Sequence, residues 1–105
     1  MIEVYHRKNP NFMLYGEAAY DEHRLAWLTD GYEKVATIES VPEGNDPAEY
    51  AFYITNSIEK PWVDNEGVTP IGRSHRSTSV GDVVKTPDGI LLICAPAGFK
   101  PLLNP

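Results

Sequence analysis

Apolar and polar residues alternate along Ile2–His6, a pattern typical of a half-buried β-strand. The segment Tyr32–Ser40 is rich in β-branched residues, which fit a pleated surface, and it predicts a second strand. Between the two, Phe12–Leu28 is irregular, but apolar residues within Glu17–Leu28 have partly helical spacing. We therefore expect an irregular excursion that contains a short helix.

The clearest local signal is a helix start at Asp46. Its side chain can accept from free backbone N–H groups, and Pro47 suits the first helical position. Glu49 completes a pattern resembling a capping box, and Pro61 limits the other end, so we predict a helix over 46–59. Apolar and small residues recur every three or four positions on one predicted buried face, namely Ala48, Ala51, Phe52, Thr55 and Ile58.

The C-terminal third predicts a β-hairpin. Val80–Lys85 and Ile90–Ala95 flank the sequence Thr-Pro-Asp-Gly, in which Asp-Gly supplies the turn geometry. The continuously apolar run Ile90–Cys94 predicts a strand buried on both faces, and Gly98–Phe99 predicts a last extended piece. Residues 61–78 are predicted to form a long loop, which in a small domain is usually functional or mobile.

Together these elements predict an α+β fold in a single domain, residues 1–105. It consists of a small, mostly antiparallel sheet with one main helix and a C-terminal β-hairpin. The composition agrees with this prediction, since 42% hydrophobic and 23% charged residues are ordinary for a globular protein. No apolar run is long enough to span a membrane, and Met1–Lys8 lacks the apolar core of a signal peptide, so we expect a cytoplasmic protein.

Cysteine and histidine usage argues against a metal centre or a bound cofactor. Cys94 is the only cysteine, which excludes an internal disulfide and a thiolate zinc cluster within one chain. The three histidines show no close metal-ligand spacing. We therefore expect neither metal nor cofactor.

The formal net charge of −6 disfavours broad electrostatic attraction to nucleic acid or to anionic membranes. The charge is uneven, however. Nine acids and only two Lys or Arg lie within Glu17–Glu49, whereas Gly67–Ser79 contains two arginines, one histidine and no acid. An acidic face and a small basic patch can therefore coexist on one molecule.

The basic, hydroxyl-rich run that leads into the Gly81-Asp82 turn is the most unusual segment. Its arginines can hold a phosphate or a carboxylate, because guanidinium offers paired donors in a fixed fork. Against this, a run of short hydroxyl side chains often only satisfies backbone groups in a loop. We favour this structural role, with Asp82 fixing the turn before the strand. The candidate residues of the run are Arg73, His75, Arg76, Ser77, Thr78 and Asp82.

Asn56 and Trp62 flank the end of the predicted helix. Asn56 is expected to hydrogen-bond to the backbone around Ser77 rather than to take part in catalysis. Trp62 can stack on a base or a ligand, but a tryptophan beside a helix end more often closes the core.

Two nucleophilic arrangements are considered and disfavoured. A pair of Cys94 and His75 would need a thiolate, whereas Cys94 lies in an apolar strand where a buried thiol stays protonated. A triad of Ser77, His75 and Asp82 fits by residue type only, and no Gly-x-Ser-x-Gly pattern accompanies it. We therefore assign no catalytic residue.

Three pieces of the chain carry a resemblance to known proteins. They are 53–58 with the following Trp62, the segment Arg76–Val83 (Arg-Ser-Thr-Ser-Val-Gly-Asp-Val) and Gly98–Phe99. Together they resemble small uncharacterised proteins of bacteria, phages and plasmids, including YodL-like domains. The resemblance implies a mobile-element setting and no established activity.

The favoured hypothesis is a non-enzymatic accessory protein of a phage or mobile element that contacts a host or element protein. Inhibition of a host defence factor is one version of it. One alternative is nucleic-acid binding through the basic run 73–79, and another is an enzyme that acts on a small anionic substrate.

Overall fold

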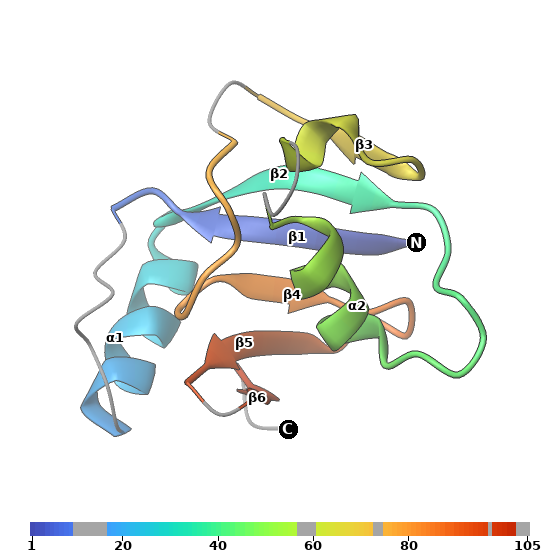
Figure 1. The fold of residues 1–105 in the computed structure, drawn as a ribbon. Coiled ribbons are helices and arrows are strands. Elements are labelled where there is room, and N and C mark those ends of the chain that lie inside the picture. The colour runs from blue at the N-terminus through green and yellow to red at the C-terminus, as the bar shows by residue number, and fades with distance from the viewer. Residues whose placement is uncertain (10–16, 57–60, 73–74, 97, 103–105) are drawn as a thin grey trace.

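Within its described residues, the chain forms one six-stranded antiparallel sheet and two α-helices. Figure 1 shows their arrangement. The computed structural model describes residues 1–9, 17–56, 61–72, 75–96 and 98–102. The strand order is β3-β2-β1-β4-β5-β6, and every pairing is antiparallel, which confirms the predicted α+β class. The strands are β1 (Ile2–Arg7), β2 (Tyr32–Ile38), β3 (Val68–Pro70), β4 (Val83–Lys85), β5 (Leu91–Ala95) and β6 (Gly98–Pro101).

The helices are α1 (Glu17–Leu28) and α2 (Pro47–Ile54), and a short 3₁₀ helix, η1, spans Trp62–Asp64. Figure 1 shows α2 lying across one face of the sheet and α1 at the end of the sheet near the C-terminal end of β1. The start of α2 is as predicted, because the Asp46 carboxylate accepts from the Glu49 N–H at 3.0 Å.

The sheet buries apolar side chains on both faces. Side chains alternate along β1, so Val4 and Tyr5 face opposite sides. Val4 belongs to a core under α2 that includes Ala48, Ala51 and the fully buried Trp62. The second core lies under α1 and contains Tyr5, Trp27, Tyr32, Val83, Ile93 and Leu102.

Several predicted elements are confirmed with nearly the expected bounds. The strand over Ile2–His6 extends one residue further, to Arg7, and the helix over Glu17–Leu28 is present. The predicted hairpin also forms, with β4 paired to β5 in antiparallel register, and β6 adds the last extended piece.

Other expectations need correction. The helix predicted over 46–59 ends at Ile54, because the backbone of Thr55 leaves helical geometry (φ −105°, ψ 24°); residues 57–60 lie outside the described part. The segment predicted as a plain loop contains η1, and β3 pairs there with β2. The apolar run Ile90–Cys94 is not buried throughout, since Ile90, just before β5, is 50% exposed, and Leu91 and Leu92 are half-buried.

Candidate functional site

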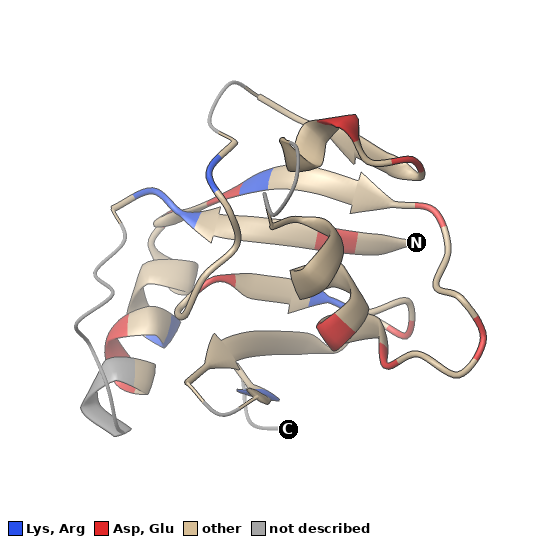
Figure 2. Ribbon diagram, in the orientation of Figure 1, with Lys and Arg blue, Asp and Glu red and all other residues tan. Residues whose placement is uncertain are grey.

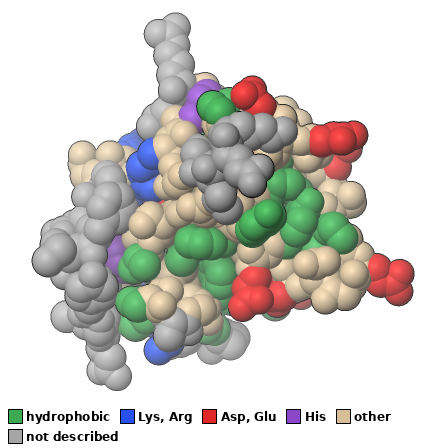
Figure 3. All heavy atoms as spheres, viewed as in Figure 1, with side chains coloured by type: hydrophobic (Ala, Val, Ile, Leu, Met, Phe, Trp, Pro, Cys, Tyr) green, Lys and Arg blue, Asp and Glu red, His purple; other side chains and the backbone are tan. Residues whose placement is uncertain are grey.

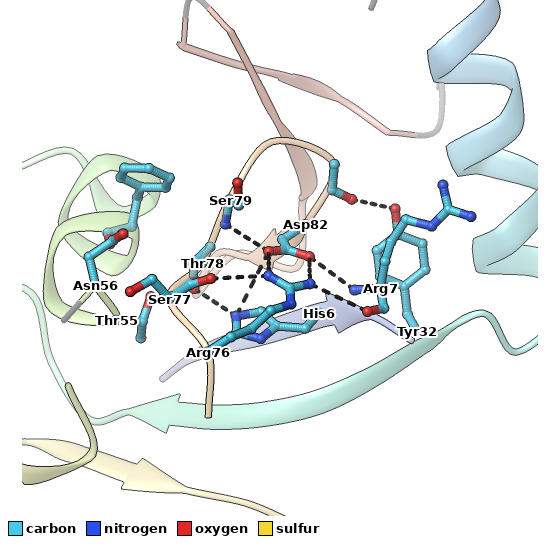
Figure 4. Close-up of polar contacts among 12 residues, drawn as sticks. His6, Arg7, Tyr32, Thr55, Asn56, Arg76, Ser77, Thr78, Ser79 and Asp82 are labelled. Atoms are coloured by element: carbon cyan, nitrogen blue, oxygen red, sulfur yellow. Dashed lines mark hydrogen bonds and ion pairs between the residues drawn. The ribbon is translucent and has the colours of Figure 1, made fainter. Parts of the chain in front are cut away.

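Asp82 lies immediately before β4 and is the centre of a buried ionic cluster, drawn in Figure 4. Only 1% of Asp82 is exposed. Its carboxylate accepts from two guanidinium nitrogens of Arg76, at 2.7 and 2.8 Å, and from the backbone N–H groups of Arg7 at 2.9 Å and Ser79 at 2.7 Å. Four donors therefore satisfy both oxygens, and no open position is left for a general base.

Arg76 joins the polar run to β1. Its guanidinium also donates to the Arg7 carbonyl at 3.3 Å and to the Ser77 carbonyl at 3.0 Å. The side chain is 26% exposed. Since its donors face Asp82 and two carbonyls, the guanidinium is committed to holding the loop rather than free to clamp an anion.

A chain of hydroxyl and imidazole contacts runs beside this cluster. Thr55 and Thr78 hydroxyls lie 2.6 Å apart, and His6 Nε2 lies 2.8 Å from the Thr78 hydroxyl. Thr55 donates to the Ala51 carbonyl at 2.6 Å. Since Thr55 uses its only hydroxyl hydrogen on Ala51, Thr78 must donate to Thr55. Thr78 then has no hydrogen left for His6, so the His6 Nε2–H donates to Thr78. The network thus selects the Nε2–H tautomer of His6.

His6 is held neutral by its surroundings. Burial lowers the pKa of His6 to about 4, the nearby Asp82 charge opposes that shift, and Arg76 adds to it. Nδ1, the acceptor nitrogen in this tautomer, has no hydrogen-bond partner within the described residues. His6 therefore serves as a neutral donor.

The geometry differs from that of a catalytic triad. In a triad, one imidazole nitrogen faces the acid and the other faces the nucleophile. Here the same His6 nitrogen faces both Thr78 and, at 3.9 Å, Asp82. Thr78 is only 2% exposed, so its hydroxyl is closed to a substrate.

The turn that presents Asp82 depends on Gly81. Its φ of +94° favours glycine, and a Cβ there would lie 2.8 Å from the His23 Cε1 atom. The Tyr32 hydroxyl donates to the Gly81 carbonyl at 2.5 Å. His23 of α1 and Tyr32 of β2 therefore fix this turn from two directions, which explains why Asp82 reaches Arg76 and β1.

Trp62 closes the core beside the same loop. It is fully buried, and its indole N–H donates to the His75 and Arg76 carbonyls at 3.0 and 2.9 Å. The His75 ring packs edge-on against it, with ring centroids 5.6 Å apart. Because the indole is enclosed, it offers no open face for stacking on a base.

The remaining predicted residues have separate positions. The Asn56 side-chain amide, two residues beyond the end of α2, donates to the Phe52 carbonyl of that helix. Arg73 lies outside the described residues. Within the described part of the chain, the Nε2 atom of His75 has no hydrogen-bond partner, so no contact of that nitrogen joins it to Ser77 and Asp82 as a triad would.

Cys94 is unsuited to nucleophilic chemistry. The thiol is buried, and burial together with the Asp82 charge raises its pKa to about 12. A thiol with that pKa is protonated at neutral pH and is therefore a poor nucleophile.

Sequence reasoning did not include His6, Arg7, Tyr32 and Thr55 in the site. One signal for His6 was present, because strand alternation places it on the same inward face as Ile2 and Val4. A histidine on a buried face needs a polar partner, and the partner proved to be Thr78.

A second feature is an apolar hollow of about 330 Å³ between α2 and the β5–β6 edge of the sheet. Phe52 and Phe99 meet there edge-on, with centroids 6.3 Å apart. Glu49, Cys94, Ala95, Pro96 and Gly98 complete the lining. Figure 3 shows hydrophobic side chains gathered on the face that carries α2, with acidic side chains beside them.

Acidic residues surround this side of the molecule. Figure 2 shows them on α2 and along the segment that connects β2 to α2. Glu39, Glu43, Asp46 and Glu49 are all exposed. Of these four residues, Glu49 is in the lining of the apolar hollow.

No helix in the described ranges is both long and apolar enough to cross a membrane. Among those same residues, no group of three or more His, Cys, Asp or Glu side chains is placed to hold a metal ion. Comparison of the chain with family models, curated proteins and solved structures finds no match. The functional inference therefore rests on the geometry of the molecule.

Proposed function

We propose that this protein is a non-enzymatic binding protein that contacts a partner protein through the hollow between α2 and β6. The observation that carries the proposal is the pairing of Phe52 and Phe99 in an open apolar hollow with the exposed Glu49 at its edge. Apolar pockets with a polar rim are typical centres of protein interfaces.

The rim charge selects the kind of partner. With a net charge of −6 and Glu49 in the lining of the hollow, a partner that presents Lys or Arg beside an apolar side chain is favoured. The apolar side chain would pack in the hollow against the two phenylalanine rings, and the basic group would approach Glu49. A host or element protein of the cytoplasm is the expected source, in line with the resemblance to YodL-like and phage or plasmid proteins.

The buried ionic cluster supports a binding role rather than an enzymatic one. The Asp82 carboxylate is saturated by four donors, and Arg76 is committed to Asp82 and to carbonyl groups. The nucleic-acid alternative relied on the segment 73–79 and the enzyme alternative on Arg73 and Arg76; of the two arginines, Arg76 is engaged in the cluster, and Arg73 lies outside the described residues. In the proposed function the cluster instead holds the loop and α2 in place.

The test is affinity capture from bacterial lysate with the wild-type chain and two charge-reversed variants. Glu49→Lys changes the rim of the hollow, whereas Glu39→Lys makes the same charge change at the end of β2. We expect wild type and Glu39→Lys to retain the same protein, and Glu49→Lys to lose most of it. Absence of any retained protein would overturn the proposal, and equal retention by all three chains would exclude this hollow as the contact.

A further inference from the structure

A second hollow, of about 320 Å³, lies between α1 and β6 and has a different chemistry. It is lined by Tyr20, Asp21 and Arg24 from the helix and by Lys100 from the edge strand. Two cations from distant parts of the sequence thus meet in one depression of an acidic protein. This combination points to an anionic ligand.

Arg24 is held in a fixed position at this hollow. Its Nε donates to the Leu102 carbonyl at 2.7 Å, and its Nη1 donates to the Asp21 carboxylate at 2.9 Å. No other acceptor bonds the guanidinium within the described residues, so Nη2 keeps its donors for solvent or a ligand. A guanidinium already anchored through two of its nitrogens loses little side-chain freedom when it binds an anion.

Lys100 supplies the second charge. Its ammonium lies 5.3 Å from the centre of the Tyr20 ring, within the range of a cation–π contact. In the described part of the chain, no carboxylate lies within 4.0 Å of this ammonium, whereas Lys8 and Lys34 each have an acidic partner. The Lys100 ammonium therefore lies beside the Tyr20 ring, and no carboxylate of the described residues neutralises its charge.

We propose that this hollow binds the phosphate group of a small phosphorylated ligand. Asp21 offsets one of the two cations, which leaves a local excess of one positive charge in the lining. A phosphate monoester carries close to two negative charges at neutral pH and accepts from both a guanidinium fork and an ammonium. A monocarboxylate carries half that charge and is expected to bind more weakly. This site is independent of the contact proposed at the α2–β6 hollow.

The test is a titration followed by two-dimensional NMR of the backbone amides at constant ionic strength. Inorganic phosphate, glycerol phosphate and acetate are each added to the wild type, to Lys100→Gln and to the control Lys34→Gln. We expect saturable shifts around Tyr20, Arg24 and Lys100 with both phosphates, with acetate weaker. Tighter binding of glycerol phosphate than of inorganic phosphate would assign the site to the monoester, and the reverse would assign it to the free ion.

The variants separate a site from general charge effects. Lys100→Gln should weaken phosphate binding at least tenfold, whereas Lys34→Gln should leave it unchanged. Arg24→Lys keeps the charge but removes the fork, and it should also weaken binding. Shifts that grow linearly without saturation, or equal affinity in Lys100→Gln and wild type, would overturn the proposal. Unchanged amide dispersion in each variant before titration establishes that the fold is intact.

Discussion

The Arg76 guanidinium donates two hydrogen bonds to the Asp82 carboxylate, at 2.7 and 2.8 Å, and the two residues are only six positions apart in the sequence. Asp82 also accepts from the Arg7 backbone, 75 positions earlier in the sequence. The Asp82 carboxylate therefore bonds to the polar loop, through Arg76 and Ser79, and also to β1, through the Arg7 backbone. Removal of this carboxylate should lower the free energy of unfolding.

Asp82→Ala is expected to lower the free energy of unfolding by about 1–3 kcal/mol, because buried donors of Arg76, Arg7 and Ser79 lose their acceptor. Urea denaturation of the variant beside the parent measures the effect. Lys8→Ala is the matched control, since it removes an exposed ion pair with Asp30 and should change stability by less than about 0.5 kcal/mol. Equal stability of Asp82→Ala and Lys8→Ala would contradict the structural role.

Gly81→Ala should destabilise the protein more than Gly89→Ala does. Both glycines have a positive φ, +94° and +88°, so both variants bear a backbone penalty of about 1–2 kcal/mol. Only at Gly81 does the new Cβ also meet His23, at 2.8 Å, while space at Gly89 is open. Overpacking adds about 1–3 kcal/mol at Gly81. Thermal melts of the two variants decide this, and indistinguishable melting temperatures would mean that His23 moves aside at little cost.

Local patterns were sufficient to predict most of the framework. Alternation predicted β1, the Asp46-Pro47 pair predicted the start of α2, and Asp88-Gly89 predicted the β4–β5 turn. These signals work because the physical cause lies within a few residues of the effect. The end of α2 was harder, since Thr55, where the helical geometry ends, contacts Thr78, which lies 23 positions away in the sequence.

The contacts of the ionic cluster were beyond local reasoning. The run 73–82 is visible as unusual in the sequence, but His6 and Arg7 approach it only because β1 pairs with β4. The β3 strand has only three residues, which is too short to show an alternating pattern in the sequence. It is stabilised by pairing with β2. One hollow forms where α2 approaches β6 and the other where α1 approaches β6. The spacing of residues in the sequence does not predict either approach.

Cys94 should resist modification in the folded protein. Its thiol is buried and its pKa is raised to about 12, so the reactive thiolate is scarce at pH 8. We expect iodoacetamide to label the native chain at least a hundredfold more slowly than the chain unfolded in guanidinium chloride. Mass spectrometry of timed samples gives both rates. Rapid labelling of the native protein at pH 8 would show that the sheet opens readily around β5.

Acid should destabilise the protein through His6 before most carboxylates titrate. The pKa of His6 is about 4 in the folded state and rises toward 6.5 on unfolding, so the unfolded chain binds the proton first as pH falls. Stability is therefore retained above pH 6.5 and declines between pH 6.5 and 4. Burial lowers the pKa of His23 as well, which acts in the same direction.

Between pH 7 and pH 5, the His6 contribution to this decline amounts to about 2 kcal/mol. His6→Gln keeps a donor for Thr78 but does not titrate in that range, so its stability should depend less on pH even if it is lower at pH 7. Urea denaturation at pH 7, 6 and 5 for both chains measures the two slopes. Parallel slopes would mean that His6 binds its proton equally well in the folded and unfolded states. That result would be incompatible with an imidazole that is enclosed between Thr78 and Asp82. Protonation of His6 would place a further charged group beside the buried Asp82, and the new Nδ1–H would have no hydrogen-bond partner among the described residues.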